Sequence, residues 1–110
     1  MRSGRSAVRK LVYRPLARED LAEIYWRRAE REGFASAAEL VLAIQDRCEG
    51  LVSFSERGTP RPEIGPGVRS VPFRRKAVIA YLVRPATVVI IGIIYGGRGL
   101  AALKEPGRLP

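Results

Sequence analysis

The chain contains no histidine and only one cysteine, Cys48, among its 110 residues. Without histidine it lacks the commonest general base, the Ser-His-Asp and Cys-His catalytic arrangements, and most zinc sites. We therefore expect no metal site. A single cysteine excludes an internal disulfide, which fits a reducing cytoplasm. Cys48 falls on an apolar helical stripe, where a buried core residue is a commoner role than a nucleophile.

The sequence also lacks a long apolar segment. Its apolar stretch from Val88 to Tyr95 is too short to span a bilayer as a helix. The basic N-terminus is not followed by the apolar core of a signal peptide. At 110 residues the chain predicts one domain with a modest core. We expect a cytoplasmic protein without membrane contact.

Acidic residues are few, with 11 Asp and Glu against 20 Lys and Arg, so the net charge is +9. A charge of this size attracts polyanions such as nucleic acid, an acidic membrane surface or an acidic protein. The alternative is that it serves solubility alone. Basic residues dominate 1–14 and 57–84, whereas 15–56 mixes both signs.

The first half of the chain predicts a short strand and two helices. Residues 10–14 alternate as a strand, and Pro15 then suits the first turn of a helix that runs to Glu32. Gly33 is typical of a left-handed helix end. Ser36 to Glu39 matches a capping box and predicts a second helix that ends near Ser53. The short connection indicates an antiparallel helical hairpin.

The second half predicts three strands, at 68–73, 77–83 and 87–95, after an irregular Gly/Pro-rich loop. The expected fold is α+β: a short N-terminal strand, an antiparallel helical hairpin and a three-stranded antiparallel sheet, in the order β-α-α-β-β-β. We expect a domain over 9–99, with a disordered tail at 1–8 and a flexible tail at 100–110.

The last predicted strand is apolar on both alternating sets, where a half-exposed strand would alternate apolar and polar residues. One set holds Val88, Ile90 and Ile94, and the other holds Val89, Ile91 and Ile93. The helical hairpin covers one face of the sheet. The other face needs a stable partner, unless the C-terminal tail folds back over it.

Six short motifs cover residues 9–99 in a fixed order. They are Leu11-Val12-Tyr13, Asp20-Leu21-x-x-Ile24, Gly58-Thr59-Pro60-Arg61-Pro62-Glu63-Ile64, Gly67-Val68-Arg69-Ser70-Val71-Pro72, Tyr81-Leu82-Val83 and Ile94-Tyr95-Gly96-Gly97-Arg98. Together they resemble the ParE branch of the ParE/RelE superfamily of bacterial toxin–antitoxin systems. The chain departs from the family pattern at Tyr95, where histidine is usual, and at Gly99, where aspartate is frequent.

The resemblance implies a toxin that acts on DNA gyrase by binding, with no catalytic residue and no cofactor. It implies a ParD-like antitoxin whose C-terminal segment wraps the helical hairpin and the sheet, and operator DNA bound indirectly through that antitoxin. The fold class and the apolar last strand agree with such a complex.

Two groups of residues are candidates for contacts. The candidates for binding the target or an anion are Arg69, Arg74, Arg75 and Arg98. The candidates for the antitoxin interface are Tyr25, Trp26, Val89, Ile91, Ile93 and Tyr95. Each arginine also has a structural interpretation: Arg69 suits a loop-pinning donor, and Arg98 suits a local pair that orders the tail. Arg74 and Arg75 suit solvated positions in a hairpin turn.

The main alternative is a ribosome-dependent mRNA endoribonuclease of RelE type. Cleavage of RNA through its 2′-hydroxyl needs a proton acceptor, a proton donor and cations around the phosphorane. The middle strand carries Ala77, Val78 and Ile79 where those ribonucleases place an arginine, so the constellation is incomplete. A third possibility is a family member that only binds its antitoxin.

Overall fold

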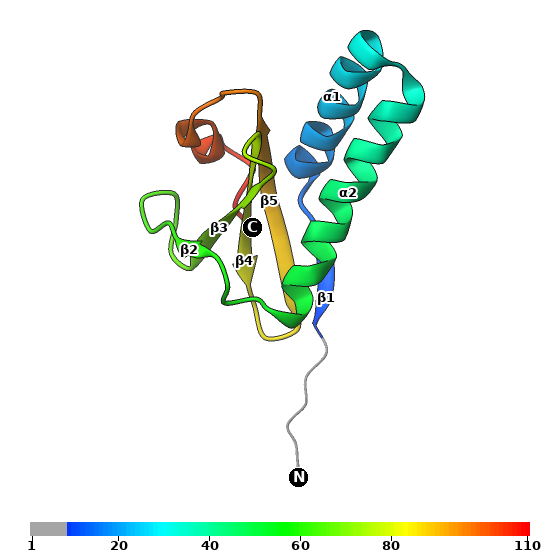
Figure 1. Ribbon diagram of the computed structural model, residues 1–110. Helices are drawn as coiled ribbons and strands as arrows, with labels where there is room; N and C mark the ends of the chain where they lie inside the picture. The colour runs from blue at the N-terminus through cyan, green and yellow to red at the C-terminus, as the bar shows by residue number, and fades with distance from the viewer. Residues whose placement is uncertain (1–8) are drawn as a thin grey trace.

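The computed structural model describes residues 9–110, so the tail expected at 1–8 lies outside the described residues. The elements are β1 (Lys10–Tyr13), α1 (Pro15–Glu32), α2 (Phe34–Ser53), β2 (Thr59–Pro60), β3 (Val68–Phe73), β4 (Ala77–Val83), β5 (Thr87–Tyr95) and the 3₁₀ helix η1 (Leu100–Lys104). Figure 1 shows the two helices side by side against one face of the sheet. The predicted α+β class and element order are confirmed.

The sheet is larger than the three-stranded core that the sequence predicts. It has five strands in the order β1-β5-β4-β3-β2, and β1 runs parallel to β5 while the other neighbours are antiparallel. β1 is short because Pro15 begins α1 two residues after its end. The long last strand therefore lies inside the sheet, between β4 and β1, although the short β1 pairs only with its first part, from Thr87 to Ile90.

The connection between the two helices of the hairpin is shorter than expected. α2 begins at Phe34, so Ser36 lies inside the helix and its hydroxyl bonds Glu32 of α1 at 3.2 Å instead of capping a first turn. The predicted start at the capping box is wrong because Gly33 alone reverses the chain, with φ +92°. Its N–H bonds the carbonyl of Ala29, and its positive φ favours glycine.

The main core lies between the hairpin and the sheet. Its fully buried side chains include Leu40, Ile44, Cys48 and Leu51 from α2 and Ile79, Tyr81, Val88 and Ile90 from the sheet. Cys48 is a core residue, as predicted, and burial raises the pKa of its thiol to about 11. It therefore stays protonated and unreactive at neutral pH.

β5 changes face partway along its length. Its register against β4 shifts between Ala80 and Tyr81, which pair with Gly92 and Ile90, so one residue of β5 is extra. Such a bulge moves the following side chains to the opposite face. Ile93 consequently packs in the core under the hairpin, and Ile94 packs on the other face. The strict alternation that placed Ile93 with Val89 and Ile91 is wrong for this reason.

The second face of the sheet is covered by the chain itself, so of the two covers that the sequence left open, a partner or the C-terminal tail, the structure has the tail. Val89, Ile91 and Ile94 are 6%, 0% and 4% exposed. They pack in a second apolar cluster with Ile64 of the Gly/Pro loop and with Leu103 of η1. Residues 100–110, which the sequence predicts as a flexible tail, lie across this face; we call them the C-terminal strap.

Removing the Tyr81 hydroxyl is expected to lower stability by about 1–3 kcal/mol, because two buried groups lose their partner. The hydroxyl accepts a hydrogen bond from Gly58 N–H at 2.9 Å and donates one to the Ser55 carbonyl at 2.8 Å. Urea unfolding of the Tyr81→Phe variant measures the loss. Tyr25→Phe is the matched control, since the half-buried Tyr25 hydroxyl has no hydrogen bond within residues 9–110. Equal urea midpoints for the two variants would contradict the stabilising role assigned to the Tyr81 hydroxyl.

Candidate functional site

A pocket of about 200 Å³ opens between the C-terminal half of α1 and the end of β5. Ten residues line it: Asp20, Glu23, Ile24, Arg27, Arg28, Arg31, Ile93, Tyr95, Gly96 and Arg98. Four of the ten are arginines, and we call this site the arginine pocket. Its volume is below the range of roughly 300–1,000 Å³ typical of small-molecule sites, so it suits a single charged group.

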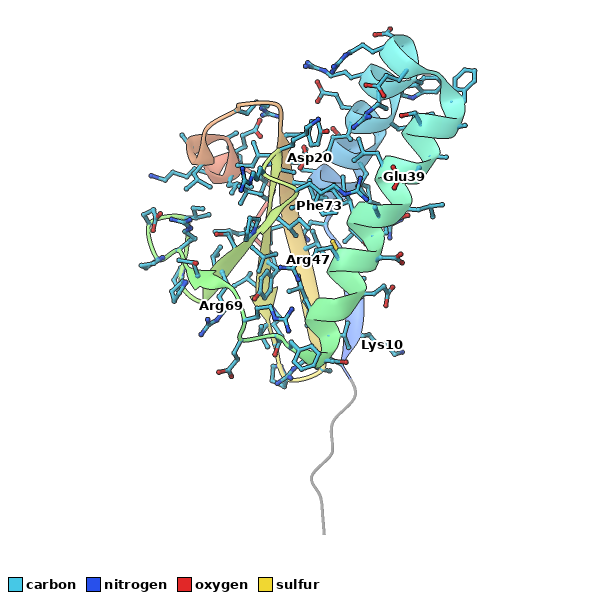
Figure 2. All side chains as sticks on the ribbon, in the orientation of Figure 1. Lys10, Asp20, Glu39, Arg47, Arg69 and Phe73 are labelled. Atoms are coloured by element: carbon cyan, nitrogen blue, oxygen red, sulfur yellow. The ribbon has the colours of Figure 1, made fainter. Side chains whose placement is uncertain are left out.

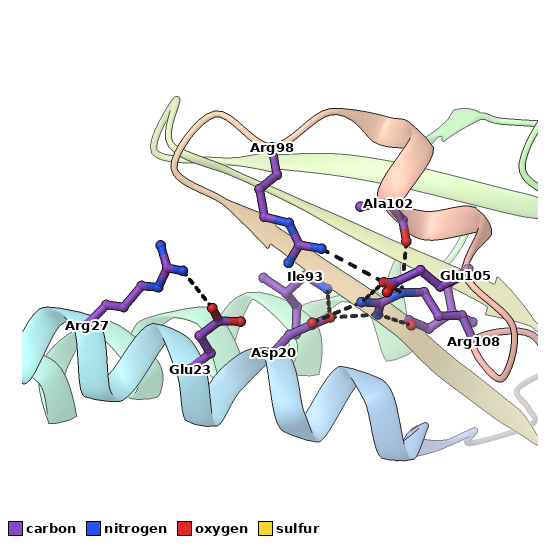
Figure 3. A network of polar contacts seen from close by, with 9 residues as sticks. Asp20, Glu23, Arg27, Ile93, Arg98, Ala102, Glu105 and Arg108 are labelled. Carbon is purple, nitrogen blue, oxygen red and sulfur yellow. Dashed lines mark hydrogen bonds and ion pairs between the residues drawn. The ribbon is translucent and has the colours of Figure 1, made fainter.

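Two elements bring the arginines together. Arg27, Arg28 and Arg31 come from successive turns of α1, where residues four apart share a face. Arg98 follows β5 after Gly96 and Gly97, whose φ angles of +71° and +92° turn the chain back. Figure 3 shows Arg98 above α1, with its guanidinium directed toward the side chains of the network.

The arginines have weak or exposed partners. Arg27 pairs with Glu23 at 2.8 Å on the open surface, and Arg98 reaches Glu105 only at 3.9 Å. Exposed pairs of this kind contribute little and exchange readily. Arg31 forms no ion pair within the described part of the chain. The pocket therefore has cationic groups available for an incoming anion.

Arg28 is held more firmly. It donates to the Tyr95 hydroxyl at 3.2 Å and to Glu32 at 3.0 Å. The hydrogen bond with Tyr95, with Glu32 acting in the same direction, raises the pKa of Arg28. This pair fixes the phenol of Tyr95 at the wall of the pocket and leaves its proton free to donate.

A buried ion pair forms the base of the site. Arg108 of the strap donates to Asp20 of α1 at 2.7 and 3.0 Å, and both residues are almost inaccessible, at 3% and 6%. Arg108 also donates to Glu105, and these carboxylates, Asp20 foremost, raise the pKa of Arg108. The charge of the Asp20 carboxylate is thus compensated by Arg108, and this carboxylate is not available to act as a base at the pocket.

The same pair, Asp20 and Arg108, provides hydrogen-bond partners for backbone groups on the part of the β5 edge that β1 does not cover. The ladder of β1 with β5 ends at Tyr13 and Ile90. Beyond it, Arg108 donates to the Ile91 carbonyl at 3.1 Å, and the Ile93 N–H donates to Asp20 at 2.9 Å (Figure 3). Buried backbone groups need such partners. Two side chains 88 positions apart therefore take the place of a neighbouring strand.

Of the four predicted anion-binding arginines, the structure brings only Arg98 into the pocket. Arg69 donates to the carbonyls of Glu56 and Gly58 at 3.1 and 2.7 Å, so it pins the loop, and Figure 2 shows it near β2, away from Asp20. Arg74 pairs with Glu39 of α2 at 3.1 Å. Arg75 lies exposed beside it in the turn between β3 and β4.

The predicted antitoxin-interface residues divide into two groups. Val89, Ile91 and Ile93 are buried in the two cores, and Tyr95 is half-buried at the arginine pocket. Tyr25 and Trp26 remain at the surface near the tip of the hairpin, where their ring centroids lie 5.2 Å apart and 6.4 and 6.2 Å, respectively, from that of Phe34. Trp26 is 58% and Phe34 65% exposed, which is unusual for side chains of their size.

A shallow groove begins beside this aromatic cluster and follows the seam of the two helices. Its lining consists of Tyr13, Arg18, Leu21, Ala22, Tyr25, Val41 and Gln45. The groove is mostly apolar with one arginine, so it suits an amphipathic segment that carries acidic residues. It is a second surface, on the helical side of the molecule.

The sequence missed most of the arginine pocket. In the sequence, Arg27, Arg28 and Arg31 suit the C-terminal end of a helix as cations, and their spacing places them on neighbouring positions of its surface. Their closeness to Arg98 depends on the packing of α1 on β5, which no local pattern encodes. The roles of Asp20 and Arg108 were missed for the same reason.

Within residues 9–110 no group of three or more Cys, Asp or Glu side chains is arranged to hold a metal ion. No helix in this part of the chain is long and apolar enough to cross a membrane. The arginine pocket contains cations, a phenol and two ion-paired carboxylates. Such a set is suited to binding an anion.

Comparisons with known proteins give one consistent result. The family model described as the ParE toxin of the type II toxin–antitoxin system parDE matches residues 11–99. Nine chains of solved structures match, among them one titled as a chromosomal ParDE toxin–antitoxin system from P. aeruginosa. That chain is 25% identical with a TM-score of 0.72, over 83% of this chain and 99% of the other. No curated protein sequence matches.

Proposed function

We propose that this chain, which belongs to the ParE toxin family of type II toxin–antitoxin systems, inhibits DNA gyrase by binding it in the cytoplasm. We further propose that a ParD-like antitoxin neutralises it and links it to operator DNA. The observation that supports this most is the family match over residues 11–99. The chemistry of the arginine pocket agrees with it, because the pocket offers cations for binding and its carboxylates are already paired.

The surface supports a protein partner at the hairpin. Trp26 and Phe34 are large and exposed and pack edge to face, and aromatic residues are frequent in the centres of interfaces. The adjacent groove between α1 and α2 fits an amphipathic segment. We therefore retain Tyr25 and Trp26 as proposed antitoxin contacts and add Phe34. Val89, Ile91 and Ile93 are buried, so they could meet a partner only after the strap moves.

Purified toxin is expected to block the supercoiling of relaxed plasmid by gyrase and to increase linear DNA recovered after denaturation. Inhibition should saturate near one toxin per gyrase active site and should be reversed by the antitoxin. Relaxation of the supercoiled form of the same plasmid by a type I topoisomerase is the control, because a basic protein that merely coats DNA would slow both enzymes. Normal supercoiling at a large molar excess of toxin would contradict the proposal.

The alternative, ribosome-dependent RNA cleavage, is supported by one observation, the Tyr95 phenol beside Arg28. The middle strand carries only apolar side chains at Ala77, Val78 and Ile79, as the sequence indicated. Primer extension on mRNA in translating ribosomes distinguishes the two functions. We expect no cuts at the ribosomal A site, and new cuts would support the ribonuclease.

A further inference from the structure

The arginine pocket combines features that no other described surface of the chain shares. Four guanidinium groups from α1 and the segment after β5 surround a space of about 200 Å³. Carboxylates compensate them only in part, because Asp20 is taken by Arg108 from outside the pocket lining, Glu23 pairs with Arg27, and Glu32 pairs with Arg28. The positive charge that is left at the pocket comes from Arg31 and from Arg98, whose nearest carboxylate in the described residues, that of Glu105, is 3.9 Å away.

The donor arrangement favours a phosphate over a carboxylate. A carboxylate offers two oxygens, which one or two arginines satisfy. A backbone phosphate also has two charged oxygens, but they are arranged tetrahedrally, so they pair with arginine in a bidentate manner and also suit donors arriving from several directions. Arg27 and Arg31 lie one turn apart on α1, and Arg98 faces them from the other side of the pocket. The Tyr95 hydroxyl adds a neutral donor of the kind that often contacts phosphates.

The pocket lacks the amide side chains that read adenine, and its arginines can contact phosphate as well as guanine. Asparagine and glutamine are absent from its lining, which is otherwise apolar at Ile24, Ile93 and Gly96. Contacts of arginine and tyrosine with phosphates position a protein on nucleic acid without sequence preference. The pocket is also too small for a whole nucleotide cofactor and open to the surface, so a backbone phosphate of a polymer can enter it.

From these observations we propose that the arginine pocket binds a backbone phosphate of DNA, so that the toxin contacts the DNA as well as the enzyme that holds it. The proposal rests on the proposed function for the choice of DNA as the polyanion. It assigns Arg31 and Arg98 as the principal phosphate ligands, because Arg28 is engaged with Tyr95 and Glu32. It predicts binding without sequence preference.

The test measures binding of the full chain, without gyrase, to a fluorescent DNA duplex by anisotropy between about 50 and about 200 mM salt. The Arg31→Gln/Arg98→Gln variant is expected to bind about tenfold to a hundredfold more weakly. The slope of log K against log salt should become less steep by about 0.9, which is the contribution of the one phosphate that the pocket binds. Two duplexes of different sequence should give the same constants.

The matched control is Lys10→Gln/Arg84→Gln, which removes the same charge at the opposite end of β5. It should change affinity and slope much less than the pocket variant. Equal losses in the two variants would show that the overall charge alone attracts DNA and would overturn the proposal. Unchanged DNA binding by the pocket variant would overturn it as well. A competition experiment gives a third such outcome: a labelled acidic peptide that is displaced from the pocket by unlabelled peptide but not by DNA. Thermal unfolding of each variant establishes that it is folded.

The outcomes separate this proposal from the function on which it rests. Wild-type toxin that inhibits gyrase but binds no DNA duplex would overturn the phosphate site alone. Wild-type toxin that binds duplex through the pocket but leaves supercoiling unaffected would overturn gyrase inhibition alone.

Discussion

Replacing Arg108 with methionine is expected to destabilise the protein by about 3–5 kcal/mol, because it leaves the buried carboxylate of Asp20 without its counter-ion. Asp20 is 6% exposed and would keep only the N–H of Ile93 as a partner. The Ile91 carbonyl would lose its donor as well. A loss of this size is a large fraction of the 5–15 kcal/mol that stabilises a typical domain.

Asp20→Asn should destabilise in the same direction but by less. The amide oxygen can still accept from Ile93, and Arg108 keeps Glu105 at 2.8 Å. Because the two residues act as a unit, the double variant should lose less than the sum of the single losses. Urea denaturation of the four proteins gives the coupling energy.

Glu105→Gln is the control for this cycle. Glu105 contacts Arg108 from the surface with about half of its side chain exposed, so its loss should cost below about 1 kcal/mol. If Arg108→Met costs no more than Glu105→Gln, the buried pair does not hold the strap, and this account of the C-terminal segment is wrong.

The second large effect is expected from ending the chain at Gly99. This removes Leu103, which is 1% exposed, together with Arg108, and it uncovers Val89, Ile91 and Ile94 of β5. Loss of a buried leucine costs about 2–5 kcal/mol and loss of one ion-pair partner about 3–5 kcal/mol. Together these approach the whole stability of a small domain. The shortened chain should lose its cooperative thermal transition and bind a hydrophobic dye.

Two further variants locate the effect. Removing only Pro110 keeps Leu103, Arg108 and the Leu109 carbonyl that accepts from Arg14, so the transition should be unchanged. Gly92→Ala should weaken the strap without deleting it, since the new methyl group would lie 2.5 Å from Leu103 and 2.7 Å from Arg108. We expect a loss of about 1–3 kcal/mol there. A truncated chain that melts as cooperatively as the full chain would show that the strap is not part of the fold.

Local signals in the sequence predict the elements well. Pro15 at the first position of α1, the helical spacing of Leu21 and Ile24, and the turn residues between the strands each act within a few positions. These signals depend on the backbone preferences of neighbouring residues, and the structure follows them. The start of α2 differs only because one glycine, Gly33, suffices for the reversal.

The arrangement across the sheet could not be predicted in this way. A single extra residue near Ile91 exchanges the faces of Ile93 and Ile94, and nothing in the apolar run marks that position. The choice between a partner and the tail as cover for the second face was decided by Leu103 and Arg108. Both lie in a Gly- and Pro-rich segment that looks irregular by itself. Contacts between distant residues, such as Asp20 with Arg108, have no signature in one sequence.

The covered second face changes which surfaces a partner can use. With the strap in place, the exposed apolar side chains near the hairpin tip are Trp26 and Phe34. A partner that wraps the sheet as well must first displace the contacts of Leu103 and Arg108. A partner that binds only at the hairpin leaves the contacts of the strap intact.

The central claim is that the toxin acts on gyrase and leaves translation intact. It is tested most directly in cells that express the chain without an antitoxin, by following a DNA-damage (SOS) reporter and the incorporation of labelled methionine together. The account predicts that the reporter rises while protein synthesis continues, and that co-expression of the antitoxin abolishes the rise. An immediate arrest of methionine incorporation with a silent reporter would contradict it.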